Sequence, residues 1–175
     1  SGVYTKDAGE YLIDGEPVEF KSTQDAIAHK ISIMHQEFNL IPAFNVADNI
    51  YLSNEPMKSG FVDKQELMKN AQKLAEQVRL TIPLNRLIRD LTVAQQQLVE
   101  IAKCLSVQSR VVIMDEPTAP LSVNETEKLF SLIEELKAQG IAIIYISHRM
   151  DEIFRISDRV TVLRDGELVG IFQTR

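Results

Sequence analysis

Two adjacent carboxylates, Asp115 and Glu116, follow a short apolar run and directly precede a proline. The run, Val111 to Met114, has no polar break, which is typical of a strand that is buried on both faces of a parallel sheet. Ligands of open α/β sheets bind at the carboxyl edge of the strands. One carboxylate could therefore hold a metal ion there while the other activates a water molecule. A strand that runs into a solvated acidic turn is the alternative.

Two further polar side chains stand where predicted strands end. Gln36 follows the apolar run Ile31 to Met34, and His148 follows the run Ile141 to Ile146. If these strands are parallel neighbours of the strand before Asp115, all the polar side chains meet at one edge of the sheet. Taken singly, Gln36 could be an ordinary loop amide, and His148 could be a surface or helix-capping histidine. Their joint placement at strand ends favours a ligand-binding site at this edge of the sheet.

The four side chains suit phosphate chemistry. Mg²⁺ takes oxygen ligands and keeps several waters, so Asp115 and the amide oxygen of Gln36 could hold it directly or through water. Glu116 could orient and deprotonate a water molecule for attack on phosphorus. His148 could donate a hydrogen bond to the transferred phosphoryl group and hold the water in line.

The elements that must carry these residues alternate between strand and helix, which predicts an α/β fold with a mostly parallel sheet. The turn pairs Asp14-Gly15 and Asp165-Gly166 lie between apolar runs and predict two β-hairpins. Capping residues followed by apolar residues at helical spacing predict the helices. In chain order, the predicted helices span about 22–29, 45–52, 63–78, 94–105, 122–140 and 150–156.

The chain divides into three stretches by this pattern. Residues 45–105 show helical spacing without strand runs, so we predict an all-helical subdomain there. Residues 1–44, with the first hairpin and Gln36, and residues 106–175, with the Asp115-Glu116 pair and His148, would form two parts of one core. The 175 residues are enough for a single domain with an inserted lobe.

Composition excludes several classes of protein. The chain is 45% hydrophobic and 25% charged, as ordinary globular domains are. Its net charge of −6 comes without a basic cluster, so nothing in the electrostatics favours nucleic acid or an anionic membrane as a partner. No apolar run approaches the ~20 residues of a membrane-spanning helix. The single cysteine, Cys104, cannot form an intramolecular disulfide, and its apolar surroundings in sequence predict a buried thiol.

The motifs, in this order, resemble those of ATP-binding cassette (ABC) proteins. Val111 to Glu116 resembles the Walker B strand with the catalytic glutamate, Gln36 matches the Q-loop, and Ser147-His148 matches the switch histidine. Leu91 to Gln95 stands in place of the signature Leu-Ser-Gly-Gly-Gln. The resemblance covers essentially the whole chain. It implies a P-loop NTPase core with a mostly parallel sheet, a small antiparallel β portion and an inserted α-helical subdomain.

The resemblance also assigns roles. It implies ATP as the nucleotide and Mg²⁺ as the metal, with Glu116, His148 and Gln36 as catalytic residues and Asp115 and Gln36 at the metal. Residues of the signature and of the D-loop would serve ATP held by the opposite cassette of a dimer. These residues are Thr92, Val93, Ala94 and Gln95 in the signature and Ser122 in the D-loop.

Three longer stretches, 34–40, 97–103 and 145–154, resemble the ATPase subunits of bacterial monosaccharide importers of the ribose, galactose and xylose type. Such subunits usually carry two cassettes, and this chain is more similar to the first. The resemblance implies a cytoplasmic protein peripheral to the inner face of the cell membrane. Its partners would be a second cassette, transmembrane permease subunits and, indirectly, a periplasmic sugar-binding protein. Apolar residues at 38–44 could receive the permease or belong to the core of the lobe.

The sequence departs from the family pattern at three places. No glycine is followed by lysine, so the phosphate-binding loop Gly-x-x-x-x-Gly-Lys-Ser/Thr is absent, and we expect an N-terminally truncated chain. Ala94 replaces the second glycine of the signature, which predicts a weakened half-site because a methyl group limits close approach. Ser122 ends Pro120-Leu121-Ser122, where many members carry Ala-Leu-Asp in the D-loop.

Two other functions are alternatives to an energising ATPase subunit. A non-catalytic or regulatory cassette that cannot bind ATP by itself fits the absent loop, but the retained pair of Glu116 and His148 favours hydrolysis in the parent protein. A DNA-repair or chromosome-organising ATPase of the same superfamily would need long coiled-coil arms between Gln36 and the signature. Residues 45–105 are too few for such arms and lack heptads.

Overall fold

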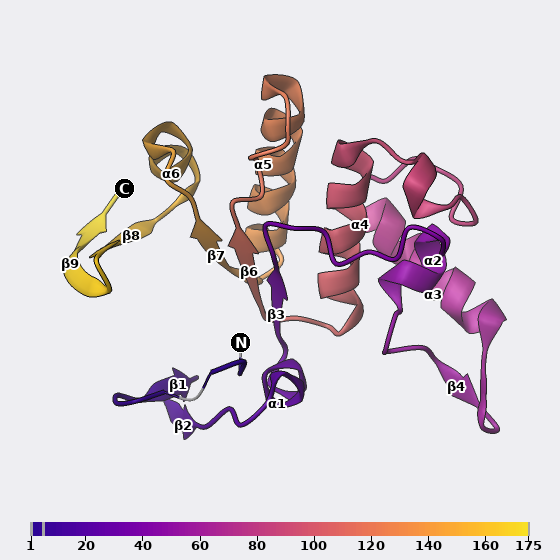
Figure 1. Cartoon of the computed structure of the whole chain (residues 1–175), viewed down its shortest axis with the longest axis horizontal. Coiled ribbons are helices and arrows are strands. Elements are labelled where there is room, and N and C mark those ends of the chain that lie inside the picture. Colours follow the sequence, from indigo (N-terminus) through magenta and orange to yellow (C-terminus); the bar gives the residue numbers. More distant parts are fainter. Residues whose placement is uncertain (1, 5, 175) are drawn as a thin grey trace.

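A parallel three-stranded sheet forms the centre of the computed structural model, which describes residues 2–4 and 6–174. Its strand order is β3 (Ile31–Met34), β6 (Val111–Asp115) and β7 (Ala142–Ile146), as Figure 1 shows. Met34 pairs with Met114, and Asp115 pairs with Ile146, so the three strands end at the same edge. The predicted α/β fold with a parallel sheet is confirmed.

Only one face of this sheet is well buried. Val112 and Met114 have 0% exposure and share a core with residues of α4 (Val93–Ser106) and α5 (Val123–Ala138). On the other face Ile113 is half-buried and its register partner Ile144 is 50% exposed. The expectation that the strand before Glu116 is buried on both faces is therefore wrong, because the described helices cover a single face.

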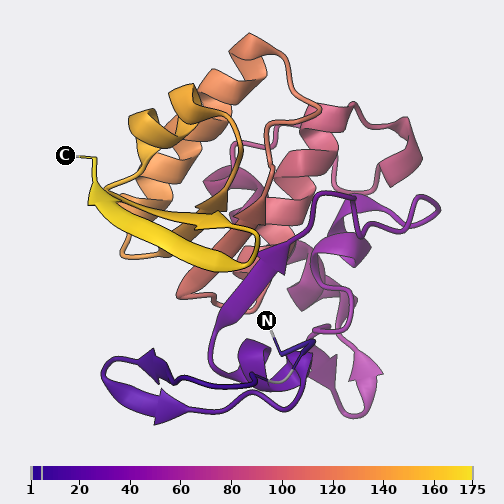
Figure 2. The same ribbon diagram turned by 60° about the vertical axis from the view of Figure 1, so that its left-hand side comes forward.

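Two antiparallel hairpins flank the sheet, as the turn pairs predicted. They are β1 (Tyr11–Ile13) with β2 (Glu16–Val18), and β8 (Arg159–Arg164) with β9 (Glu167–Gln173). Asp14 and Gly15 have φ values of 53° and 85°, so both central residues adopt the left-handed conformation that a tight hairpin turn requires. Figure 2 shows β1–β2 at the end of the molecule where β3 begins, and Figure 1 shows β8–β9 on the side of β7 away from β6.

Helices α1 and α3 begin at the capping residues that the sequence offers. Ser22 accepts a hydrogen bond from the backbone N–H of Asp25 at the start of α1 (Thr23–Ala28). Asp63 accepts two backbone N–H groups at the start of α3 (Lys64–Gln77). The other helices are α2 (Val46–Ile50), the short 3₁₀ helix η1 (Ile88–Asp90) and α6 (Met150–Ile156).

The stretch 45–105 is not all-helical, which corrects the expectation from its spacing. Between α2 and α3 the chain forms a small hairpin of β4 (Met57–Lys58) and β5 (Phe61–Val62). The turn at Ser59 and Gly60 has φ values of 52° and 85°, so a turn signal was present, but two-residue strands are too short to show alternation. Helices α2, α3 and α4 pack on one another beside the sheet (Figure 1).

No helix in residues 2–4 and 6–174 has both the length and the apolar character that crossing a bilayer demands.

Cys104 lies inside the core between α4 and the sheet, with 5% exposure. Burial raises the pKa of its thiol to about 11, which confirms the expectation of a buried thiol.

The raised pKa predicts slow alkylation of Cys104 in the folded protein. At pH 8 the thiolate fraction of an unfolded cysteine, with a pKa of about 8.5, is roughly 200-fold higher than that of the buried Cys104 thiol. We therefore expect iodoacetamide to label Cys104 about 200-fold more slowly in native buffer than in urea. Comparable rates in the two conditions would contradict the buried position, and a Cys104→Ser variant gives the background.

Candidate functional site

The structure brings Gln36, Glu116 and His148 together at the carboxyl edge of the sheet. His148 Nδ1 lies 2.8 Å from Glu116 Oε1, and Gln36 Nε2 lies 3.4 Å from Glu116 Oε2. Each residue follows a different strand of the parallel sheet, and the shared edge explains why residues 80 and 32 positions apart can meet. The His148 side chain is 76% exposed and that of Glu116 27%, so a ligand from solvent can reach both.

Glu116 is held in an uncommon backbone conformation. Its φ is 47°, a left-handed value that side chains other than glycine rarely adopt. Its N–H donates to the carbonyl of Ile146 at the end of β7, and its own carbonyl accepts the N–H of Ala119 in the following turn. These bonds fix the direction of the Glu116 side chain relative to β7. Strain of this kind is common where a side chain is positioned for function.

Asp115 is the last residue of β6 and is half-buried. Its carboxylate forms no hydrogen bond or ion pair with another described residue, so both oxygens remain available. Gln36 donates through Nε2, which leaves its amide oxygen available as well. Residues 2–4 and 6–174 contain no group of three or more His, Cys, Asp and Glu side chains placed to hold a metal. One carboxylate and one amide oxygen nevertheless fit Mg²⁺, which usually takes its other ligands from water and phosphate.

The signature residues form the start of α4. Thr92 is the N-cap, and its Oγ1 accepts the N–H of Gln95, while the Gln95 side chain accepts the N–H of Thr92. This capping box leaves the N–H groups of Val93 and Ala94 without helical partners, and such groups attract anions at a helix N-terminus. No described hydrogen bond or ion pair joins these residues to Glu116 or His148. Their role at the site of an opposite cassette stays a prediction.

Ser122, the residue predicted at the D-loop, is exposed and forms the capping box of α5. Its hydroxyl lies 2.6 Å from Glu125 Oε2, and its N–H donates to the same oxygen at 2.9 Å. The hydrogen bonds from Ser122 lower the pKa of Glu125. The structure thus gives Ser122 a structural task at the helix start, and its contact across a dimer stays a prediction.

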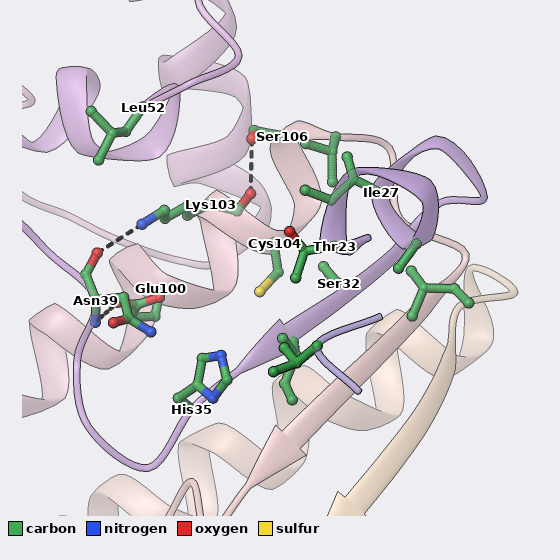
Figure 3. Close-up of a pocket in the computed structure, with 15 residues that line it drawn as sticks. Thr23, Ile27, Ser32, His35, Asn39, Leu52, Glu100, Lys103, Cys104 and Ser106 are labelled. Atoms are coloured by element: carbon green, nitrogen blue, oxygen red, sulfur yellow. Dashed lines mark hydrogen bonds between the residues drawn. The ribbon is translucent and has the colours of Figure 1, made fainter. Parts of the chain in front are cut away.

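The sequence did not identify the residues that hold the loop after Gln36. Asn39 donates its N–H to Glu100 Oε1 at 2.6 Å, and Lys103 Nζ donates to the Asn39 carbonyl at 2.7 Å. Figure 3 shows both side chains extending from α4 to this loop, beside a cavity of about 230 Å³. Glu100 is 4% exposed, and burial raises the pKa of its carboxyl group. Helix α4, which begins with the signature, therefore also fixes the loop that begins at Gln36.

The apolar residues after Gln36 differ in how deeply they are buried. Leu40 is 9% exposed and belongs to the core, and Phe38 packs against that core. Ile41 is half-buried, and Phe44 is 43% exposed. The lobe-core interpretation therefore accounts for Phe38 and Leu40, and Phe44 is the most exposed of the four.

The sheet is open on the side of β7. Within the described residues, β7 pairs with β6 alone, and its other edge has no strand partner. A hollow of about 1090 Å³ lies between β7 and β8, with Ile144, Tyr145 and Val160 in its lining. Further polypeptide could pair with β7 here, next to the strand end that carries His148.

Comparison with known proteins places the chain in a family. The family model described as ABC transporter matches residues 1–119. Two solved ATP-binding cassettes share the fold. A nucleotide-free cassette from an ABC transporter has a TM-score of 0.85 at 24% identity, and the match covers 98% of this chain and 72% of that one. A dimeric cassette bound to ADP and phosphate in a post-hydrolysis state has a TM-score of 0.79 at 23% identity, and the match covers 99% of this chain and 77% of that one. The chain belongs to the ABC transporter family and has the fold of its ATP-binding cassettes.

Several sugar-import ATP-binding proteins are similar to this chain in sequence. The ribose import ATP-binding protein of Hahella chejuensis is 46% identical over 97% of this chain and 34% of its own length. The galactose/methyl galactoside import ATP-binding protein of Pasteurella multocida is 45% identical over 97% and 33%. A relative in Burkholderia ambifaria reaches 52% identity over 97% of this chain and 33% of its own length. The chain thus spans about a third of the length of these relatives.

Glu100 offers a local test of this geometry. In a Glu100→Ala variant of the complete polypeptide the N–H of Asn39 loses its acceptor, at a cost of about 1–3 kcal/mol. We expect amide hydrogen exchange at Asn39 to become about 5- to 150-fold faster, as measured by mass spectrometry of short peptides. A Glu100→Gln variant keeps an acceptor oxygen and should exchange nearly as the unchanged protein does. Unchanged exchange in Glu100→Ala would show that the contact does not hold the loop.

Proposed function

We propose that this chain forms the water- and metal-handling part of an ATP-hydrolysing cassette that energises sugar import through a membrane transporter. The contact of 2.8 Å between His148 and Glu116, with Gln36 beside them, is the observation that supports it most directly. A carboxylate, an imidazole and an amide at one accessible strand edge match the needs of phosphoryl transfer to water.

Glu116 serves as the general base in this proposal. Its carboxylate orients the attacking water and takes its proton, while Gln36 orients the carboxylate through Oε2. His148 donates from Nδ1 to Glu116, because an ionised carboxylate can only accept. To donate from Nε2 to a phosphoryl oxygen as well, the ring must be protonated, or it must leave Glu116 when the nucleotide arrives.

Asp115 and the amide oxygen of Gln36 would hold Mg²⁺. When bound, the ion neutralises negative charge on the phosphate groups. Asp115 is suited to this role because its carboxylate is not engaged by other described side chains.

The phosphate-binding loop and the second cassette would come from the longer parent protein. The hollow beside β7 is the place where the sheet could continue, next to the strand end of His148. The start of α4, with Thr92 to Gln95, would meet ATP held by the opposite cassette, and Ser122 would lie near that interface. The free N–H groups of Val93 and Ala94 support an anion-binding role, and the methyl group of Ala94 is expected to weaken it.

The names of the relatives support ribose or galactose as the class of cargo. On this proposal, transmembrane permease subunits are the direct partners and a periplasmic sugar-binding protein is an indirect one. The cassette would work on the cytoplasmic face of the membrane, and Phe44 offers an exposed apolar side chain to a permease.

A non-catalytic or regulatory cassette is the second candidate. It is favoured by the lack of a Gly-Lys pair in the 175 residues, since the backbone and lysine of that loop hold the phosphates. Under either function the isolated chain should bind ATP poorly, and micromolar affinity would contradict the claim that these 175 residues lack the phosphate cradle.

A Glu116→Gln variant of the complete polypeptide separates the two candidates. The amide can still accept a hydrogen bond but cannot take a proton, so we expect kcat for ATP hydrolysis to fall about 10²- to 10⁴-fold. ATP binding, measured with a fluorescent analogue, should stay intact because the phosphates are held elsewhere. Glu55→Gln, at a half-buried carboxylate outside the site, serves as a matched control and should hydrolyse normally. Hydrolysis unchanged in Glu116→Gln would overturn the catalytic function.

A further inference from the structure

Glu152 is a buried carboxylate outside the site described above. It lies on α6 and is 1% exposed, although charged side chains are rarely buried without partners. A hydrophobic residue would bury the same face of a helix without the cost of removing a charge from water. The position of Glu152 must therefore be explained by the groups that donate to it.

The donors come from strand β7 and from the two loops that carry the candidate catalytic pair. Thr118 Oγ1 lies 2.9 Å and 2.8 Å from the two carboxylate oxygens, and Thr118 is the second residue after Glu116. Tyr145 donates its hydroxyl at 2.7 Å from near the end of β7, and Ser147 lies 3.4 Å away immediately before His148.

Arg149 completes the arrangement from the other side of His148. Its Nη1 lies 2.6 Å from Glu152 Oε1, and its backbone N–H donates to the hydroxyl of Ser147 at 3.0 Å. Hydroxyl donors and one guanidinium group thus share a single carboxylate, which offsets the cost of its burial. The residues on both sides of His148 are bound to Glu152 or to one another.

We propose that Glu152 is a positioning residue that sets the distance between Glu116 and His148. The inference rests on the proposed function, because it assigns Glu152 to the same hydrolytic site. Glu152 connects the turn after β6 to the loop after β7, and each carries one member of the pair 2.8 Å apart. The backbone bond from Glu116 to Ile146 ties the turn only to the last residue of β7. Without Glu152, the loop that carries His148 could move relative to Glu116. Displacements of about 1 Å in a catalytic group can lower a rate about 100-fold.

The first test is the kinetics of Glu152→Gln and Glu152→Ala in the complete polypeptide. Glu152 forms no described hydrogen bond or ion pair with Glu116 or His148, so its loss should disturb their geometry and not the binding of ATP. We expect kcat for ATP hydrolysis to fall about 10- to 100-fold, with KM for ATP changed less than about threefold. Glu127→Gln is the matched control, because it removes an exposed ion pair between α5 and Arg155 of α6 without touching either loop. An unchanged kcat in the Glu152 variants, or an equal loss in Glu127→Gln, would overturn the proposal.

The second test asks whether Glu152 acts through the pair. In a His148→Ala background the Glu152→Gln change should cost less than about twofold in kcat, because the geometry that it sets has already been lost. Independent multiplication of the two losses would mean that Glu152 supports the fold and not the pair. If Glu152→Ala fails to fold, Tyr145→Phe removes one donor only, and it should lower kcat in the same direction with KM retained. Unchanged kcat in Tyr145→Phe would then count against the proposal.

The Glu116→Gln and Glu152→Gln variants together distinguish a failure of the positioning role from a failure of the proposed function. If Glu116→Gln hydrolyses ATP normally, the hydrolytic function fails, whatever the Glu152 variants do. If Glu116→Gln loses hydrolysis while Glu152→Gln keeps its full kcat, the function stands and the positioning role alone is wrong.

Discussion

Parallel pairing of β6 with β3 on one side and β7 on the other is the constraint on which the rest of the structure depends. Parallel strands in register end at the same edge, so the residues that follow them must meet there. Gln36, Glu116 and His148 lie far apart in the chain and become neighbours only through this pairing. The core beneath the sheet, with Met34 and Met114 against α4 and α5, fixes the pairing by burying one face.

Buried carboxylates connect the edge of the sheet to the helices around it. Glu100 and Lys103 of α4 hold both backbone groups of Asn39, so the helix that begins with the signature also positions the loop after Gln36. Glu152 of α6 holds the two loops that follow β6 and β7. A polar contact inside a protein is stronger than one in water and is costly to leave unmade. These contacts connect the loops that carry Gln36, Glu116 and His148 to buried side chains, although His148 itself faces solvent.

The sequence allowed the fold to be predicted where local rules decide. Apolar runs gave the three strands, Asp-Gly pairs gave two hairpins, and the caps Ser22 and Asp63 gave helix starts at the correct residues. The hairpin at Met57–Val62 was missed because its strands are too short for a pattern. The roles of Glu100 and Glu152 were missed because spacing rules assign charged residues to solvent, and only tertiary packing decides which of them is buried. The open face of the sheet was missed because an apolar run does not reveal which of its sides is covered.

On the proposed function, Glu116, His148 and Gln36 act on one water and one phosphoryl group at the carboxyl edge of the sheet. A crystal structure of the complete polypeptide with Mg²⁺ and a non-hydrolysable ATP analogue would show whether they do. We expect a water within about 2.6–3.2 Å of the Glu116 carboxylate, in line with the terminal phosphate, and His148 in contact with that phosphate. A terminal phosphate bound away from this edge, with Glu116 and His148 touching neither it nor its water, would rule out this role for the three residues.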